Sequence, residues 1–167
     1  MAGQELAGGE DSLTVREKLE IAVQLDPANV PILKSLAKLQ NPGSAIDTYQ
    51  RIVEIAPTDG MSWAMLFYHK LQQGQLDSGT RQALKEAVHL TPYEPAVQEV
   101  LLWAGTAHWE ALDPELRNDL VLVAGRAMMS RAPFRKKEIT AILKRGEIGQ
   151  AACSLVQFRA ALECAAL

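Results

Sequence analysis

The chain has 167 residues, of which 48% are hydrophobic and 22% are charged. This balance is typical of a soluble globular protein and excludes a disordered or collagen-like chain. Seventeen Lys and Arg residues against twenty Asp and Glu residues give a net charge of -3, which argues against generic nucleic-acid binding by the whole domain. With two cysteines the protein is not a disulfide scaffold, and a chain of this length can fold without a metal.

The first residues, MAGQELAGGEDS, are small, polar and acidic. They lack the basic start and the apolar stretch of a signal peptide, so residues 1–11 are predicted to be a flexible tail. No charge-free run approaches the roughly 18 apolar residues that a membrane span requires, and no transmembrane segment is expected. The domain is therefore predicted to be soluble, and either cytoplasmic or, if an anchor was removed before Met1, periplasmic.

Beyond the tail, apolar residues recur at helical spacing and no stretch alternates with period two. The fold is therefore predicted to be all-α. Prolines separate the periodic segments, and some follow a residue that can cap a helix, as in Asp26-Pro27, Thr91-Pro92 and Asp113-Pro114. The predicted helices span residues 12–25, 29–39, 44–55, 60–73, 78–90, 95–110, 114–130, 133–145 and 147–166.

Three segments of similar pattern recur along the chain. Each contains an apolar residue, then Asp, Ala or Thr, then Pro, and each has a leucine nine residues after the proline. The leucines are Leu36, Leu66 and Leu101, whose separations of 30 and 35 residues bracket the roughly 34-residue period of a helix–turn–helix repeat. The segments are QLDPANVPILKSLAKL, EIAPTDGMSWAMLFYHKL and HLTPYEPAVQEVLLWAG.

The stretch of chain after Pro57 has further features of such a repeat. A large aromatic residue, Trp63, precedes Leu66, Gly74 stands at the turn, Ala87 is a small residue in the second helix, and Pro92 closes the unit. The stretch after Pro27 offers a comparable set: Leu33, Leu36, Ala37, Ala45, Tyr49 and Pro57.

On these residues the chain resembles the tetratricopeptide repeat (TPR) family over roughly Val15 to Gly105. The resemblance implies stacked antiparallel helix pairs in a right-handed superhelix with a concave binding surface. We expect residues 12–132 to form the repeats and residues 133–167 to form capping helices, within one continuous domain. The sequence departs from the family at Asn41-Pro42-Gly43, which shortens the first repeat, and at Phe67 and Leu102, which replace small residues.

A second resemblance concerns the C-terminal part of the chain. The segments TPYEPAVQEVLLWAGTAHWEALDPELRNDL and GEIGQAAC are similar to the C-terminal part of TPR proteins associated with bacterial surface-polysaccharide systems. The similarity implies a bacterial protein that works beside such a system.

The sequence contains no glycine-rich phosphate loop, no HExxH and no G-x-S-x-G, which favours a non-enzyme that needs no cofactor. His69, His89 and His108 lack Cys or His neighbours at metal spacing, so no metal site is predicted. A hydrolase that uses His69 or His108 as a base is a minor alternative. Cys153 and Cys164, eleven residues apart in one predicted helix, are expected to be small core residues that cannot bridge within that helix.

In the TPR-like arrangement, one set of side chains falls on the inner surface of the helix pairs. These residues could line a groove for a peptide or a helix, although the two aromatic members could instead pack against neighbouring helices. Some TPR proteins bind the tail of a chaperone through a carboxylate clamp, a set of Lys, Asn and Arg residues on successive inner faces. Such a clamp is in doubt here, because Ala64 and Tyr68 stand in the second repeat where basic or amide residues would be needed. The groove residues are Lys34, Lys38, Met65, Tyr68, Glu99 and Trp103.

Charge is also distributed unevenly, since residues 126–145 carry seven bases and one acid, Glu138. This basic patch can attract an anionic polysaccharide, a nucleic acid or membrane headgroups. It can also be a solvated face, or the internal complement of residues 86–119, which carry seven acids and one base. Its residues are Arg126, Arg131, Arg135, Lys136, Lys137, Lys144 and Arg145.

The sequence thus predicts a non-catalytic TPR-like scaffold that binds another protein or peptide. The alternative is a domain that binds an anionic polymer through residues 126–145, and strong salt dependence would distinguish it.

Overall fold

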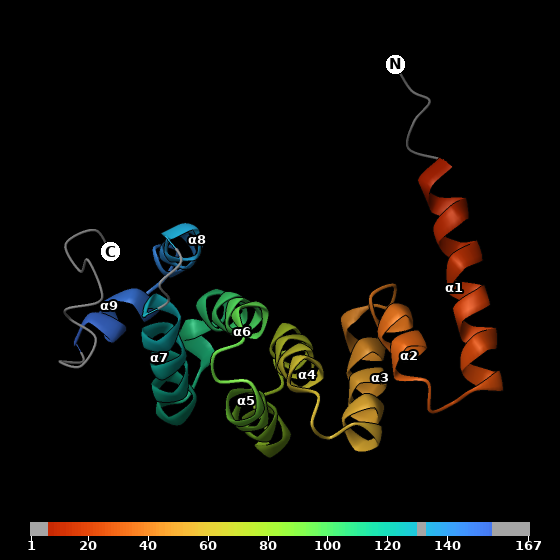
Figure 1. The fold of residues 1–167 in the computed structure, drawn as a ribbon, viewed down its shortest axis with the longest axis horizontal. Coiled ribbons are helices and arrows are strands. Elements are labelled where there is room, and N and C mark those ends of the chain that lie inside the picture. Colours follow the sequence, from red (N-terminus) through yellow and green to blue (C-terminus); the bar gives the residue numbers. More distant parts are fainter. Residues whose placement is uncertain (1–6, 130–132, 155–167) are drawn as a thin grey trace. The chain divides into compact units, whose positions relative to one another are not determined.

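The computed structural model describes residues 7–129 and 133–154, with side chains in 14–129 and 137–154. Every regular element in these ranges is a helix and no strand occurs there, so the prediction of an all-α fold is confirmed (Figure 1). The elements are α1 (Ala7–Leu25), α2 (Val30–Ala37), α3 (Pro42–Ile55), α4 (Gly60–Gln72), α5 (Ser78–Leu90), α6 (Pro95–Ala107), the 3₁₀ turn η1 (Trp109–Ala111), α7 (Pro114–Met128), α8 (Pro133–Leu143) and α9 (Ile148–Ser154).

The chain divides into two compact units, one up to Thr58 and the other from Asp59 onward. In the first unit, α1 packs on α2, and α2 packs on α3. In the second, α4 packs on α5 and α6, and α7 contacts α5, α6, α8 and α9. The described cavities that could hold a ligand lie in this second unit.

Most helix boundaries agree with the sequence pattern, and 78–90 agrees at both ends. α1 begins at Ala7, so residues 7–11 of the expected tail are helical. The predicted helix 95–110 instead ends at Ala107, and η1 follows it. Residues 130–132 and 155–167, which include the C-terminal part of the expected cap, lie outside the described residues.

The three recurring segments share one local structure. The backbone N–H groups of Asp26, Ala56 and Thr91 donate to the carbonyl oxygens four residues earlier, at 2.9, 2.8 and 3.1 Å, at the end of a helix. A two-residue turn that begins with proline follows in each case, because the ring of proline presets the backbone angle of a turn. The next helices then begin at Val30, Gly60 and Pro95.

This turn corrects the expected positions of the helix caps. Asp26 and Thr91 lie at the ends of the preceding helices, and the N-cap residues are Asn29 and Glu94. Asn29 accepts a hydrogen bond from the Ile32 N–H at 3.2 Å, whereas Glu94 makes no side-chain cap hydrogen bond. Asp113 does cap α7, as expected, and accepts from the Leu116 N–H at 2.9 Å.

The residues that carried the repeat pattern are core residues. Leu36, Leu66 and Leu101 are buried, and Trp63 is only 8% exposed. Gly74, at the turn between α4 and α5, has a φ of 66°, a left-handed conformation that favours glycine. Phe67 and Leu102, which replace small residues of the repeat pattern, are completely buried, as is Ala87.

Candidate functional site

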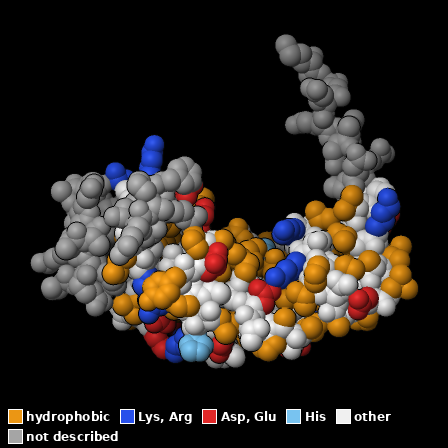
Figure 2. Space-filling view, viewed as in Figure 1, with side chains coloured by type: hydrophobic (Ala, Val, Ile, Leu, Met, Phe, Trp, Pro, Cys, Tyr) orange, Lys and Arg blue, Asp and Glu red, His pale blue; other side chains and the backbone are white. Residues whose placement is uncertain are grey.

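Apolar side chains reach the surface in several places (Figure 2). Among the described residues of the second unit, the large ones are Tyr93, Trp103 and Met129, which are 76%, 47% and 61% exposed. Single exposed apolar residues are common, but each of these three also lines a cavity. They therefore mark two candidate surfaces, one between α5 and α7 and one between α6 and α8.

Ion pairs connect α5 to the start of α7. Arg81 donates from Nη2 and Nε to Oδ2 of Asp113 at 2.8 and 3.0 Å. One turn further along α5, Lys85 Nζ lies 2.6 Å from Glu115 Oε1. Exposed pairs of this kind add little stability.

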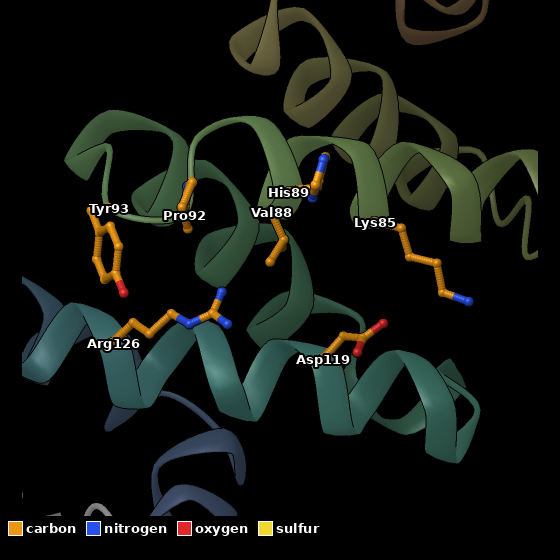
Figure 3. A pocket seen from close by; sticks show the side chains of 7 residues that line it. All are labelled: Lys85, Val88, His89, Pro92, Tyr93, Asp119 and Arg126. Carbon is orange, nitrogen blue, oxygen red and sulfur yellow. The ribbon is translucent and has the colours of Figure 1, made fainter. Parts of the chain in front are cut away.

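Beyond these pairs, a groove opens between α5 and α7 (Figure 3). We name it the Arg126 groove, because Arg126 and Tyr93 line both of the cavities that form it. The first cavity has a volume of about 400 Å³ and is lined by Lys85, Val88, His89, Pro92, Tyr93, Asp119 and Arg126. The second has a volume of about 350 Å³ and is lined by Tyr93, Pro95, Gln98, Arg126, Ala127, Met129 and Ile139.

The charged side chains of this groove differ in whether an oppositely charged partner lies nearby. Figure 3 shows Asp119 and Arg126 extending from α7 toward α5. Burial raises the pKa of the Asp119 carboxyl above its ordinary value, and the attraction of Lys85 only partly offsets this. The hydrogen bond to Glu115 raises the pKa of the Lys85 ammonium. Arg126 is half-buried and makes no ion pair with a carboxylate among the described side chains.

The second surface lies where α6 meets α8 and the residues that follow it. The guanidinium carbon of Arg145 stands 5.1 Å from the centre of the Trp103 ring, a cation–π arrangement. A small cavity of about 100 Å³ adjoins this pair and is lined by Trp103, Thr106, Ala107, Ile142 and Arg145. The Thr106 hydroxyl is buried there with no hydrogen-bond partner among the described residues.

The structure separates the predicted groove residues into two sets. Lys34 and Lys38 belong to α2 and its C-terminal end in the first unit. The other four belong to the second unit, on α4 and α6, which pack against each other. Their side chains are half-buried at Met65, Tyr68 and Glu99 and exposed at Trp103.

Tyr68 makes two local contacts on α4. Its hydroxyl oxygen accepts a hydrogen bond from Gln72 Nε2 at 2.7 Å. Its ring meets His69 edge-on, with the centroids 5.0 Å apart. These contacts hold the tyrosine along its own helix while part of its ring stays accessible.

The residues of the basic patch contribute to more than one surface. Arg126 lines the Arg126 groove, whereas Arg145 lies over Trp103. Lys137 and Lys144 are exposed. The side chains of Arg131, Arg135 and Lys136 lie outside the described residues.

His69, His89 and Cys153 differ in burial and in bonding. His69 is half-buried, and burial lowers its pKa, while His89 is exposed beside the Arg126 groove. Cys153 is disulfide-bonded, which corrects the expectation of a buried thiol. In the part of the chain that the structure describes, no three side chains of His, Cys, Asp or Glu gather in a way that could hold a metal.

Tyr93 and Met129 were not among the residues predicted from the sequence to form a binding site. Tyr93 stands in the turn that follows Pro92, and Met129 is the C-cap of α7. A signal for Tyr93 was available, because an aromatic residue in a tight turn between two amphipathic helices has no helix face on which to be buried. Met129 follows Met128, which is buried, so the sequence does not distinguish the two.

No helix within the described residues combines the length and the apolar character that a bilayer crossing requires. A scan against protein-family models found no match, and a search of curated protein sequences also found none.

Proposed function

We propose that this protein is a non-catalytic helical-repeat scaffold, similar to the TPR family, that binds another protein or peptide. The observation that carries the proposal is Trp103, which is 47% exposed on α6 with Arg145 over its ring. Tryptophan and arginine are enriched among the residues that dominate the energy of protein–protein interfaces. A partner that covers Trp103 would remove apolar surface from water without first breaking a packed core.

The repeat part of the proposal is supported by the recurring turn. Three helix ends, at Asp26, Ala56 and Thr91, have the same hydrogen bond and the same following turn. Each next helix buries a leucine at the equivalent position. A structural unit that recurs in this way is the basis of repeat proteins, in which stacked units expose a long surface for binding.

The binding face would include neighbouring stripes of α4 and α6. Met65 and Tyr68 are three residues apart on α4, and Glu99 and Trp103 are four apart on α6, so each pair lies on one side of its helix. Because α4 packs on α6, the two stripes together offer apolar, aromatic and acidic groups. This combination suits an amphipathic helix or an extended peptide.

The resemblance to repeat proteins of bacterial surface-polysaccharide systems suggests the setting of the partner. A component of such a system is therefore the first class of protein to test.

The test is to purify partners from the source cell by affinity capture and then to measure the purified interaction. We expect Trp103→Ala and Tyr68→Ala each to weaken binding by about 2 kcal/mol or more, as truncation of central aromatic anchors does. Leu39→Ala is the matched control, because Leu39 is also a large exposed apolar residue, at 40%, but belongs to the first unit. Circular dichroism verifies that each variant is folded. Equal binding by all three variants would contradict the proposal.

The alternative function, binding of an anionic polymer, is favoured by the exposure of Lys137, Lys144 and Arg145. It predicts the opposite ranking of variants. Lys137→Glu combined with Lys144→Glu would abolish binding, whereas Tyr68→Ala would leave it intact. Affinity would also fall steeply between two salt concentrations, because bound counterions are released when basic residues neutralise a polyanion.

A further inference from the structure

The Arg126 groove contains none of the stripe residues Met65, Tyr68, Glu99 and Trp103. Its lining comes from α5, the turn at Tyr93, the start of α6, α7 and α8. Along α7 it extends from Asp119 to Met129, which corresponds to about 15 Å at 1.5 Å per residue. An extended peptide rises about 3.3 Å per residue. The groove thus has the length of about five residues of an extended chain.

Arg126 is the side chain of the groove that could bind a negatively charged group of a ligand. Its guanidinium stands beside Val88 and Pro92 (Figure 3), is half-buried, and forms no ion pair with a described carboxylate. A partly desolvated arginine interacts more strongly with a carboxylate than it would in bulk water. The planar guanidinium can also donate two parallel hydrogen bonds to that carboxylate.

The second cavity lies directly beside this cation and offers apolar side chains to a ligand. Pro95, Ala127, Met129 and Ile139 line it. Met129 is 61% exposed, and its unbranched side chain can adapt to the shape of an apolar group. A ligand that fits here needs a carboxylate and an apolar side chain close together.

Asp119 argues against a polyanion as the ligand. It lies in the same groove, two helical turns from Arg126, and would repel a chain of repeated phosphates or sulfates. Lys85, which also belongs to the lining, is already paired with Glu115 at 2.6 Å. Among the described side chains of the lining, Arg126 is the permanent cation without an ion-pair partner. A single cation next to an apolar cavity matches a single carboxylate better than a polymer of anions.

We propose that the Arg126 groove binds an extended peptide segment of a partner, with an Asp or Glu side chain on Arg126 and an apolar side chain in the cavity formed by Pro95, Met129 and Ile139. The carboxylate and the apolar residue stand two positions apart, because side chains two residues apart in an extended chain point to the same side. The groove would give the scaffold a second binding surface, independent of Trp103.

The experiment uses the full chain with ¹³C-labelled methionine and isoleucine methyl groups. The probes are two capped hexapeptides of Ser and Gly that carry Glu and Leu two residues apart, in either order. Matched peptides replace Glu by Gln or Leu by Ala. Titrations follow the methyl signals of Met129 and Ile139, which report on the groove itself.

We expect at least one Glu/Leu peptide to shift both signals in a saturable manner. Its Gln counterpart should bind at least fivefold more weakly, and Arg126→Gln should weaken binding at least tenfold. Arg126→Lys should restore part of the affinity, because it retains the charge and loses the two-pronged geometry. Asp119→Asn, which removes a negative charge from the same groove, should tighten binding of the Glu/Leu peptide.

The proposal is overturned if neither peptide moves the Met129 signal, or if Arg126→Gln binds as tightly as the unchanged protein. It is also overturned if another part of the same chain fills the groove. In that case Arg126→Gln would lower the melting temperature and no peptide would shift the signals. Trp103→Ala should keep its affinity for the hexapeptide, so failure here is distinguishable from failure of the proposed scaffold function.

Discussion

Helices α1 and α7 both follow from helical spacing of apolar residues, yet they are buried to very different depths. α1 has 19 residues, and none of its described side chains, from Thr14 onward, is buried. α7 has 15 residues and contributes a row of buried side chains that includes Leu116 and Leu120. The difference arises because α7 packs on helices from several sides, whereas α1 packs on α2. The same sequence signal therefore indicates a helix without indicating its contribution to stability.

The largest test of this contrast compares a core leucine with an exposed isoleucine. Leu120→Ala should destabilise the protein by about 2 to 5 kcal/mol, because the residue is completely buried and its loss leaves a cavity. Ile21→Ala on α1, where the side chain is 57% exposed, should cost about 0.5 kcal/mol or less. Chemical unfolding followed by circular dichroism measures both values. Similar losses of stability at Leu120 and Ile21 would show that α1 is packed more deeply than the exposure of Ile21 indicates.

A second test compares glycines in the two units. A Cβ at Gly105 of α6 would stand 2.5 Å from Leu120 Cδ1 and 3.3 Å from Ile148 Cδ1. Because Leu120 is itself enclosed, Gly105→Ala should cost about 1 to 3 kcal/mol through overpacking. Gly43→Ala on α3, where the nearest atom is 3.5 Å away, should be neutral or stabilise by about 0.5 kcal/mol. Urea midpoints of the two variants should therefore move in different directions or by clearly different amounts.

A third test compares an ion pair of the second unit with one on α1. Asp77 caps α5 by accepting from the Thr80 N–H at 2.8 Å, and it lies 3.1 Å from Lys70 Nζ. Asp77→Ala should cost about 1 to 2 kcal/mol, because it removes the cap and leaves the nearly buried Lys70 without its carboxylate. Glu20→Ala breaks the exposed pair with Arg16 and should cost at most about 0.5 kcal/mol. Equal urea midpoints for Asp77→Ala and Glu20→Ala would refute the prediction that the pair of Asp77 and Lys70 contributes more stability than the exposed pair on α1.

The Asp77 effect should depend on pH in a defined direction. The hydrogen bond from the Thr80 backbone lowers the pKa of the Asp77 carboxyl below its ordinary value of 3.8. The stabilisation is therefore complete above pH 3.8 and is lost as the pH falls through the lower pKa of the folded protein. The unfolding free energies of the unchanged protein and of Asp77→Ala should approach each other in acid, as thermal melts from about pH 7 to about pH 2 will show.

The smallest expected effect concerns Asp119 in the Arg126 groove. Burial raises the pKa of this carboxyl, so the folded protein binds more protons than the unfolded chain and loses stability as the pH rises above 3.8. Asp119→Asn should raise the melting temperature by about 1 to 2 °C at neutral pH, and the gain should shrink in acid. Asp47→Asn, at an exposed position of α3, is the control and should leave the melting temperature unchanged.

Much of the local structure could be predicted from the sequence, because its causes act over a few residues. Helical spacing located most of the described helix boundaries to within two residues, although α1 begins five residues before its predicted start. The recurring prolines and the leucines Leu36, Leu66 and Leu101 were recognisable from the sequence alone. The caps at Asn29 and Glu94 were missed, since proline in this turn stands three residues before the helix and not at its first position.

The surfaces depended on tertiary structure. Trp103 and Trp63 are both tryptophans in amphipathic helices, and only packing leaves one half-exposed and the other buried. Arg126 and Arg145 belonged to one basic run, but the structure brings one beside Tyr93 and the other over Trp103. The sequence by itself determined the helices and their turns, because hydrogen bonds and side-chain periodicity are local. Only the tertiary structure decided which faces remain open, because that depends on contacts between residues far apart in the chain.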